Sequence, residues 1–159
     1  MKKTINTALA TLALATLTIF FFAFGAQAEE MGMLDTSKPH VEKIQHFLDQ
    51  LIQEDKDIAG INIHATGNDG DTTVIASTTS SKIGTPSDPE DIDAIIENKI
   101  ILISEGDILD VTVPMANKKG LPAAVAGIRF FLKNGLNKAG AKAKAIDLAK
   151  KIDAILVTK

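Results

Sequence analysis

Apolar side chains recur at helical spacing in three parts of the chain. Residues 37–55 carry one apolar stripe, with Pro39 in the first turn, which predicts a long first helix. Asp88 and Pro89 are typical of a helix start, so a short second helix follows them. Alanine-rich residues 139–157 predict a C-terminal helix. The first stripe contains Val41, Ile44, Leu48 and Leu51, widened by Phe47, and Ile92, Ile95 and Ile96 are expected to face inward from the second helix.

Strand patterns fill the space between these helices. Apolar and polar residues alternate in several short segments, and turns rich in Gly, Asn and Asp separate them. Short turns force neighbouring strands to run antiparallel. The element order predicts an α+β fold with one antiparallel five-stranded sheet, a long N-terminal helix, a short middle helix and a C-terminal helix. The expected strands span residues 60–65, 72–78, 100–104, 108–115 and 121–132.

The N-terminal segment has the parts of a secretory signal peptide. Lys2 and Lys3 precede an apolar run over residues 8–25, and Ala26-Gln27-Ala28 provides small residues for cleavage. An uncleaved anchor helix is the alternative, because residues 5–26 are just long enough to span a bilayer. We expect a signal peptide at 1–28, a flexible leader at 29–36 and one domain at 37–159. The protein is then periplasmic or secreted.

Composition narrows the function classes. The 159 residues have a formal net charge of −3, and they include no cysteine, tryptophan or tyrosine. Loss of Lys2 and Lys3 with the signal would make the rest more acidic, which argues against a nucleic-acid partner. Without cysteine there is no disulfide scaffold and no thiolate metal or cluster site. We expect no cofactor and no metal.

No catalytic motif is found in the sequence. There is no G-x-S-x-G, P-loop, G-x-G-x-x-G or H-E-x-x-H pattern, and no serine lies beside a recognisable base. Acidic residues 88–93 are accounted for by capping and by the helix dipole. A binding protein is therefore expected rather than an enzyme.

Polar residues interrupt segments that are otherwise apolar. Asp110 and Thr112 share one face of a strand whose other face is apolar, and Arg129 breaks an apolar run. His64 lies opposite Ile61 on its strand, so a surface or pocket-rim position is expected. Convergent polar groups under a long loop indicate a small-molecule pocket, and a solvated sheet face is the alternative. The candidate ligand-binding residues are Lys82, Asp110, Thr112, Arg129, His64 and Ser80.

Three segments resemble Cache domains, the extracytoplasmic PAS-like sensor modules also called PDC domains. They are Val74–Thr78, Ser81–Gly84 and Ser87–Asp91, and they are followed by Asp110–Pro114 and the pair Gly127-Ile128. The resemblance spans residues 61–155. It implies a PAS-like sheet and the binding of small metabolites outside the membrane, in a small secreted form of the family.

The resemblance also bears on the ligand. Related dicarboxylate sensors hold carboxylates with Arg and His, whereas Lys82 replaces the loop Arg here and Asp110 stands at a basic sheet position. An amine or amino-acid-like ligand is therefore favoured over a dicarboxylate. We expect no signalling output of its own, so a separate receptor would be its partner. The alternative is a structural or protein-interaction module with a vestigial pocket, dimeric through the stripe of the first helix.

Overall fold

The computed structural model describes residues 37–67, 69–116, 122–133 and 135–157. All of them belong to the second of two units, Gly32–Lys159. The expected signal peptide, the leader and the turn at 117–120 lie outside the described residues. The elements are α2 (Lys38–Glu54), β1 (Ile58–Thr66), β2 (Thr72–Ser77), the 3-10 turn η1 (Ser80–Lys82), α3 (Pro89–Glu97), β3 (Ile101–Glu105), β4 (Ile108–Ala116), β5 (Pro122–Phe131) and α4 (Lys138–Val157).

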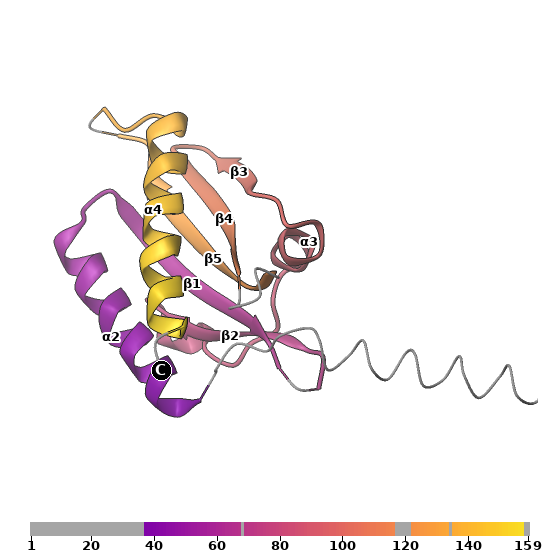
Figure 1. Ribbon diagram of the computed structural model, residues 1–159. Helices are drawn as coiled ribbons and strands as arrows, with labels where there is room; N and C mark the ends of the chain where they lie inside the picture. The colour runs from indigo at the N-terminus through magenta and orange to yellow at the C-terminus, as the bar shows by residue number, and fades with distance from the viewer. Residues whose placement is uncertain (1–36, 68, 117–121, 134, 158–159) are drawn as a thin grey trace, which may run out of the picture. The chain divides into compact units, whose positions relative to one another are not determined.

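One five-stranded sheet organises the domain, in the order β2-β1-β5-β4-β3 (Figure 1). Each pair of neighbouring strands is antiparallel, and β5 occupies the centre between β1 and β4. The predicted α+β, PAS-like fold is confirmed. Every strand expected from the sequence is present, with ends shifted by one or two residues.

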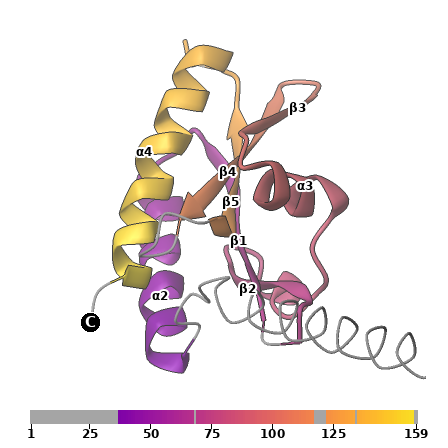
Figure 2. The same ribbon diagram turned by 45° about the vertical axis from the view of Figure 1, so that its right-hand side comes forward.

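The two faces of the sheet are covered unequally. Helices α2 and α4 pack on one face, and α3 lies on the other (Figure 2). Alternation along the strands sends apolar side chains toward α2 and α4. The fully buried side chains of this core include Ile44, Leu48, Ile61, Ile63, Leu109, Val111, Ile128, Phe130 and Ile152.

The stripe of the first helix is confirmed and packs on the chain's own sheet. Ile44 and Leu48 have no exposed surface, and Phe47 and Leu51 pack against the same core. Gln45 fastens α2 to the end of β2: its amide donates to the Ser77 carbonyl at 2.9 Å and accepts from the Ser77 N–H at 3.0 Å. The middle of the stripe, Ile44 and Leu48, is therefore buried within the domain.

The prediction that the isoleucines of the short helix face inward is wrong. Ile92 and Ile96 are exposed, at 38% and 75%, and Ile95 is only half-buried. Asp91 and Ala94 are the buried residues of α3. The helix covers the polar face of the sheet, where a carboxylate and a small alanine fit better than three isoleucines.

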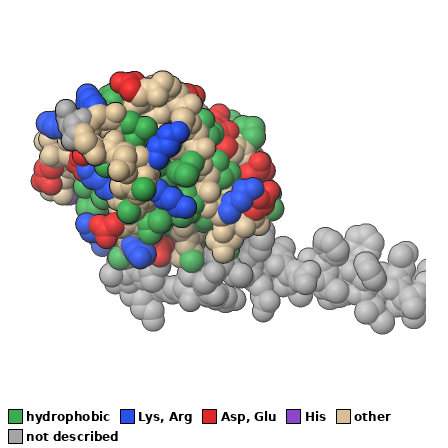
Figure 3. All heavy atoms as spheres, turned by 90° about the horizontal axis from the view of Figure 1, so that it is seen from above, with side chains coloured by type: hydrophobic (Ala, Val, Ile, Leu, Met, Phe, Trp, Pro, Cys, Tyr) green, Lys and Arg blue, Asp and Glu red, His purple; other side chains and the backbone are tan. Residues whose placement is uncertain are grey.

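Charge is mixed over the face of the molecule that Figure 3 draws. Basic and acidic side chains are interspersed there with apolar ones, rather than gathered by sign. Among the helices of the described residues, none combines the length and the apolar character needed to cross a bilayer.

Leu48→Ala is expected to lower the free energy of unfolding by about 2–5 kcal/mol, because it leaves a cavity in the core. Urea denaturation followed by circular dichroism measures the change. Gln53→Ala, at an exposed position on the same helix, is the matched control and should shift stability by less than about 0.5 kcal/mol. Equal effects of the two substitutions would contradict the packing described for α2.

Candidate functional site

A cavity of about 190 Å³ lies on the face of the sheet that α3 covers. Its walls come from β1, β4, β5, α3, η1 and the end of β3. Almost every lining side chain is polar or charged. The lining residues are Asn62, His64, Lys82, Asp88, Glu90, Asp91, Glu105, Asp110, Thr112, Gly127 and Arg129.

Strand register sets the floor of the cavity. Gly127 of β5 is paired with Asn62 on one side and with Thr112 on the other. Two residues along β5, Arg129 is paired with Asp110. Positions two apart point to the same face of a strand, so these side chains all belong to the face opposite the main core.

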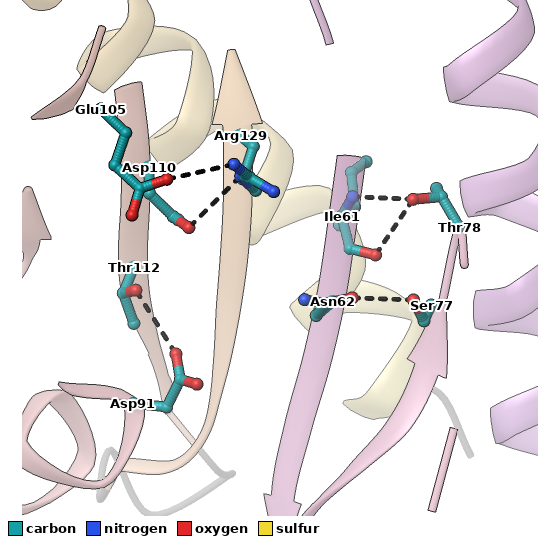
Figure 4. Close-up of polar contacts among 9 residues, drawn as sticks. All are labelled: Ile61, Asn62, Ser77, Thr78, Asp91, Glu105, Asp110, Thr112 and Arg129. Atoms are coloured by element: carbon teal, nitrogen blue, oxygen red, sulfur yellow. Dashed lines mark hydrogen bonds and ion pairs between the residues drawn. The ribbon is translucent and has the colours of Figure 1, made fainter. Parts of the chain in front are cut away.

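The outer end of the cavity is an ion-pair cluster, drawn in Figure 4. Arg129 Nη2 lies 3.3 Å from Glu105 Oε2, and Arg129 Nε lies 3.8 Å from Asp110 Oδ2. The other Asp110 oxygen, Oδ1, is buried and has no hydrogen-bond partner among the described residues. Burial raises the pKa of Asp110, and the nearby Arg129 charge opposes that rise. Asp110 is thus a carboxylate whose charge is only partly compensated.

The inner end holds a buried histidine and a buried carboxylate. His64 and Asp91 are 3% and 5% exposed. His64 Nδ1 lies 2.8 Å from Ser87 Oγ and 3.4 Å from Asp91 Oδ2. The Thr112 hydroxyl donates a long hydrogen bond of 3.4 Å to Asp91 Oδ1 (Figure 4). Side chains from β1 and β4 therefore meet the Asp91 carboxylate of α3.

Burial shifts the protonation of both groups toward their neutral forms. It lowers the pKa of His64 to about 4; the Asp88 charge opposes this shift and Lys82 adds to it. It raises the pKa of Asp91 to about 6, together with repulsion from Glu90, Asp110 and Asp88. At neutral pH the ring is therefore uncharged and Asp91 carries its negative charge.

These contacts do not form a catalytic triad. A triad needs the serine on one ring nitrogen and the carboxylate on the other. Here Ser87 and Asp91 both contact Nδ1, and Nε2 is left facing Gly127. The arrangement is suited instead to holding a ligand that donates hydrogen bonds or carries positive charge.

The cavity brings together most of the residues predicted from the sequence. Lys82, Asp110, Thr112, Arg129 and His64 all line it, although their binding of a ligand stays a prediction. Ser80, in the exposed turn η1, is not part of the lining. His64 points away from Ile61 as expected, but it is buried rather than at the surface, because α3 and the loop before it cover it.

Several lining residues were missed by sequence reasoning. The sequence analysis accounts for Asp91 by its place at an acidic helix start, yet Asp91 is the buried member of that cluster. The signal available was its spacing: Asp91 and Ala94 are three residues apart, so they share a helix face. Asn62, Asp88, Glu90, Glu105 and Gly127 also line the cavity and had no signal of their own. Within the described ranges, no three His, Asp or Glu side chains are placed to hold a metal ion.

Comparisons with known proteins support the fold. No family model and no curated protein matches the sequence. The GAF domain region of a protein from Geobacter sulfurreducens PCA has a TM-score of 0.58 at 13% identity, with 76% of this chain and 95% of that chain covered. A type II free methionine-R-sulfoxide reductase from Thermoplasma acidophilum has a TM-score of 0.54 at 13% identity, with 77% and 95% covered. A GAF domain/HD domain protein from Geobacter sulfurreducens has a TM-score of 0.51 at 12% identity, with 77% and 92% covered. The fold is therefore GAF-like and PAS-like, and the Cache resemblance stays a prediction.

Asp91→Asn is expected to raise stability at pH 7.5. The folded-state pKa of Asp91, about 6, exceeds the ordinary value of 3.8. The stability that its protonation contributes is therefore complete below pH 3.8 and is lost as the pH rises through 6. Asparagine avoids that loss, which amounts to at most about 3 kcal/mol for a shift of about two pKa units.

Chemical denaturation of the wild type and the variant from pH 4 to 8 measures this difference. The advantage of Asp91→Asn should shrink toward zero at pH 4. Asp93→Asn, an exposed carboxylate on the same helix, is the control and should show no such trend. A variant that is less stable than the wild type at pH 7.5 would contradict the burial of a charged Asp91.

Proposed function

We propose that this chain is an exported small-molecule-binding domain of the sensor type, and that the cavity beneath α3 is its ligand site. The ligand is an amine or an amino-acid-like molecule rather than a dicarboxylate. The observation that carries the proposal is the charge of the lining, which includes five carboxyl groups against two basic side chains.

Electrostatics favour a cation in this cavity. A ligand that carries a carboxylate would be repelled by the negative charges of Asp91 and Asp110. Of the lining side chains, only Lys82 and Arg129 would attract it. Arg129 is already engaged by Glu105 and Asp110. Opposite charges attract strongly where water is partly excluded, so an ammonium group gains what a carboxylate loses.

The size of the cavity supports a small ligand. Sites for drug-sized molecules are typically about 300–1,000 Å³, and this cavity is about 190 Å³. The fold is compatible with such a role, and the Cache resemblance implies the binding of small metabolites. We infer a binding role rather than catalysis, and we propose that a separate receptor reads the bound state.

A metabolite panel tests the ligand class. Thermal melting with an external dye is suitable because the chain has no tryptophan or tyrosine. A ligand at about 100 times its dissociation constant stabilises the folded state by about 2.7 kcal/mol. We expect amines or amino acids to raise the melting temperature by several degrees, and dicarboxylates to leave it unchanged. A shift with dicarboxylates alone would overturn the ligand class, and no shift with any compound would favour the interaction-module alternative.

Export is tested separately, by expressing the full chain in a Gram-negative bacterium and fractionating the cells. We expect the protein in the periplasmic fraction with Glu29 as its first residue, as intact-mass measurement would show. Retention in the cytoplasm with residues 1–28 still attached would contradict the export proposal. Recovery of uncleaved protein in the membrane fraction would favour the anchor alternative instead.

A further inference from the structure

The residue at the centre of the cavity floor, on the middle strand of the sheet, is a glycine and has no side chain. Gly127 lies in β5 between Asn62 and Thr112 of the flanking strands. Glycine weakens a strand interior and often marks a site where a ligand approaches the backbone closely. The backbone at Gly127 does not need glycine for its conformation, because its φ is not positive. We therefore attribute the glycine at position 127 to the space that it keeps open in the cavity.

Hydrogen-bond acceptors surround this space. A Cβ placed on Gly127 would lie 3.7 Å from Asp91 Oδ1 and 3.8 Å from His64 Nε2. Its third close neighbour is the Asn62 backbone oxygen at 3.8 Å, which belongs to the sheet itself. No side-chain atom is nearer than the first two. The direction in which a side chain would point thus leads to a carboxylate oxygen and a ring nitrogen.

The tautomer of His64 determines whether Nε2 donates or accepts a hydrogen bond. An ionised carboxylate only accepts hydrogen bonds, and Asp91 Oδ2 faces Nδ1. The Ser87 hydroxyl, 2.8 Å from Nδ1, can accept a hydrogen bond from it as well. We therefore assign the proton of the neutral ring to Nδ1, which leaves Nε2 with a bare lone pair. Both groups at the Gly127 gap are then acceptors, and one of them is charged.

We propose that the gap above Gly127 holds the ammonium group of a small primary amine, which donates hydrogen bonds to Asp91 and to His64 Nε2. This inference rests on the proposed function and names the position and the class of the recognised group. A primary ammonium carries three N–H donors, so it satisfies both acceptors and has one donor left. A quaternary ammonium has the same charge but no N–H, and its methyl groups need more room.

Asp110 is the weaker candidate for this role, although the sequence favours it. Its Oδ2 already faces Arg129 at the outer end of the cavity. Its side chain is 35% exposed, whereas the Asp91 side chain is 8% exposed. A cation beside Asp91 is better shielded from water. Among the described side chains, no Lys or Arg lies within ion-pair distance of Asp91, whose only such neighbour is the uncharged His64 ring. Asp110 contributes negative potential rather than the contact.

Gly127→Ala tests the position without damaging the fold. The added methyl group would make contacts at ordinary van der Waals distance, so the sheet has room for it. It fills the space that the ammonium group needs. Gly60→Ala is the matched control, since Gly60 also lies in a strand and also has ordinary room, 3.6 Å from Thr78 Oγ1, but does not line the cavity.

The experiment titrates the purified wild type and variants with n-butylamine, 1,4-diaminobutane and n-butyltrimethylammonium at pH 7.5. We expect each primary amine to bind the Gly60→Ala protein with the same affinity as the wild type. The trimethylated compound should bind both proteins at least tenfold more weakly than the primary amines do. Gly127→Ala should lose at least tenfold in affinity while its melting temperature stays the same or rises. Asp110→Asn should lose less affinity than Gly127→Ala.

Three results would overturn the inference, and only one of them also overturns the amine class of the proposed function. If the wild type binds primary amines and Gly127→Ala binds them equally, the ammonium group sits elsewhere and the proposed function survives. If the wild type binds no amine, the amine class fails and this inference fails with it. Equal binding of the trimethylated compound would also overturn it, because that compound cannot donate to Asp91 or His64.

Discussion

The burial of the Asp91 carboxylate against the middle of the sheet is the interaction on which the candidate site depends. It joins α3 to β4 through Thr112 and to β1 through His64, and it faces Gly127 of β5. Removing such a charge from water is costly unless something compensates it. Thr112 and His64 compensate it only in part, as the raised pKa of about 6 shows. The cation that we propose to bind beside Asp91 would complete the compensation and stabilise the folded state.

The fold tolerates the buried Asp91 charge because the two faces of the sheet differ in composition. The face under α2 and α4 is closed by Ile, Leu, Val, Ala and Phe side chains, with Gln45 holding α2 against Ser77. Most of the hydrophobic stabilisation comes from that side. Within the part of the chain that the structure describes, the opposite face is covered by the nine-residue helix α3 and the loop before it. Polar side chains can therefore gather there without disrupting the main core, which is a common division between scaffold and site.

The sequence predicts the scaffold well and the site in part. Alternation at Leu109–Val113 and at Ile61–His64 places Asp110, Thr112 and His64 on the correct face, because strand periodicity depends on neighbouring residues alone. The pairing of Gly127 with Asn62 and Thr112 depends on contacts between distant segments, which no local pattern reveals. The helix α3 is the clearest failure: apolar Ile96 is exposed and charged Asp91 is buried. Hydrophobic periodicity assumes an apolar surface to cover, and this helix covers a polar one.

The most direct measurement is a crystal structure of the protein with a bound primary amine. We expect the amine nitrogen inside the cavity, within about 2.7–3.2 Å of both the Asp91 carboxylate and His64 Nε2. A nitrogen bound to Asp110 instead, with the space above Gly127 empty or filled by water, would contradict the role assigned to Asp91. An amine found only outside the cavity would contradict the binding site itself.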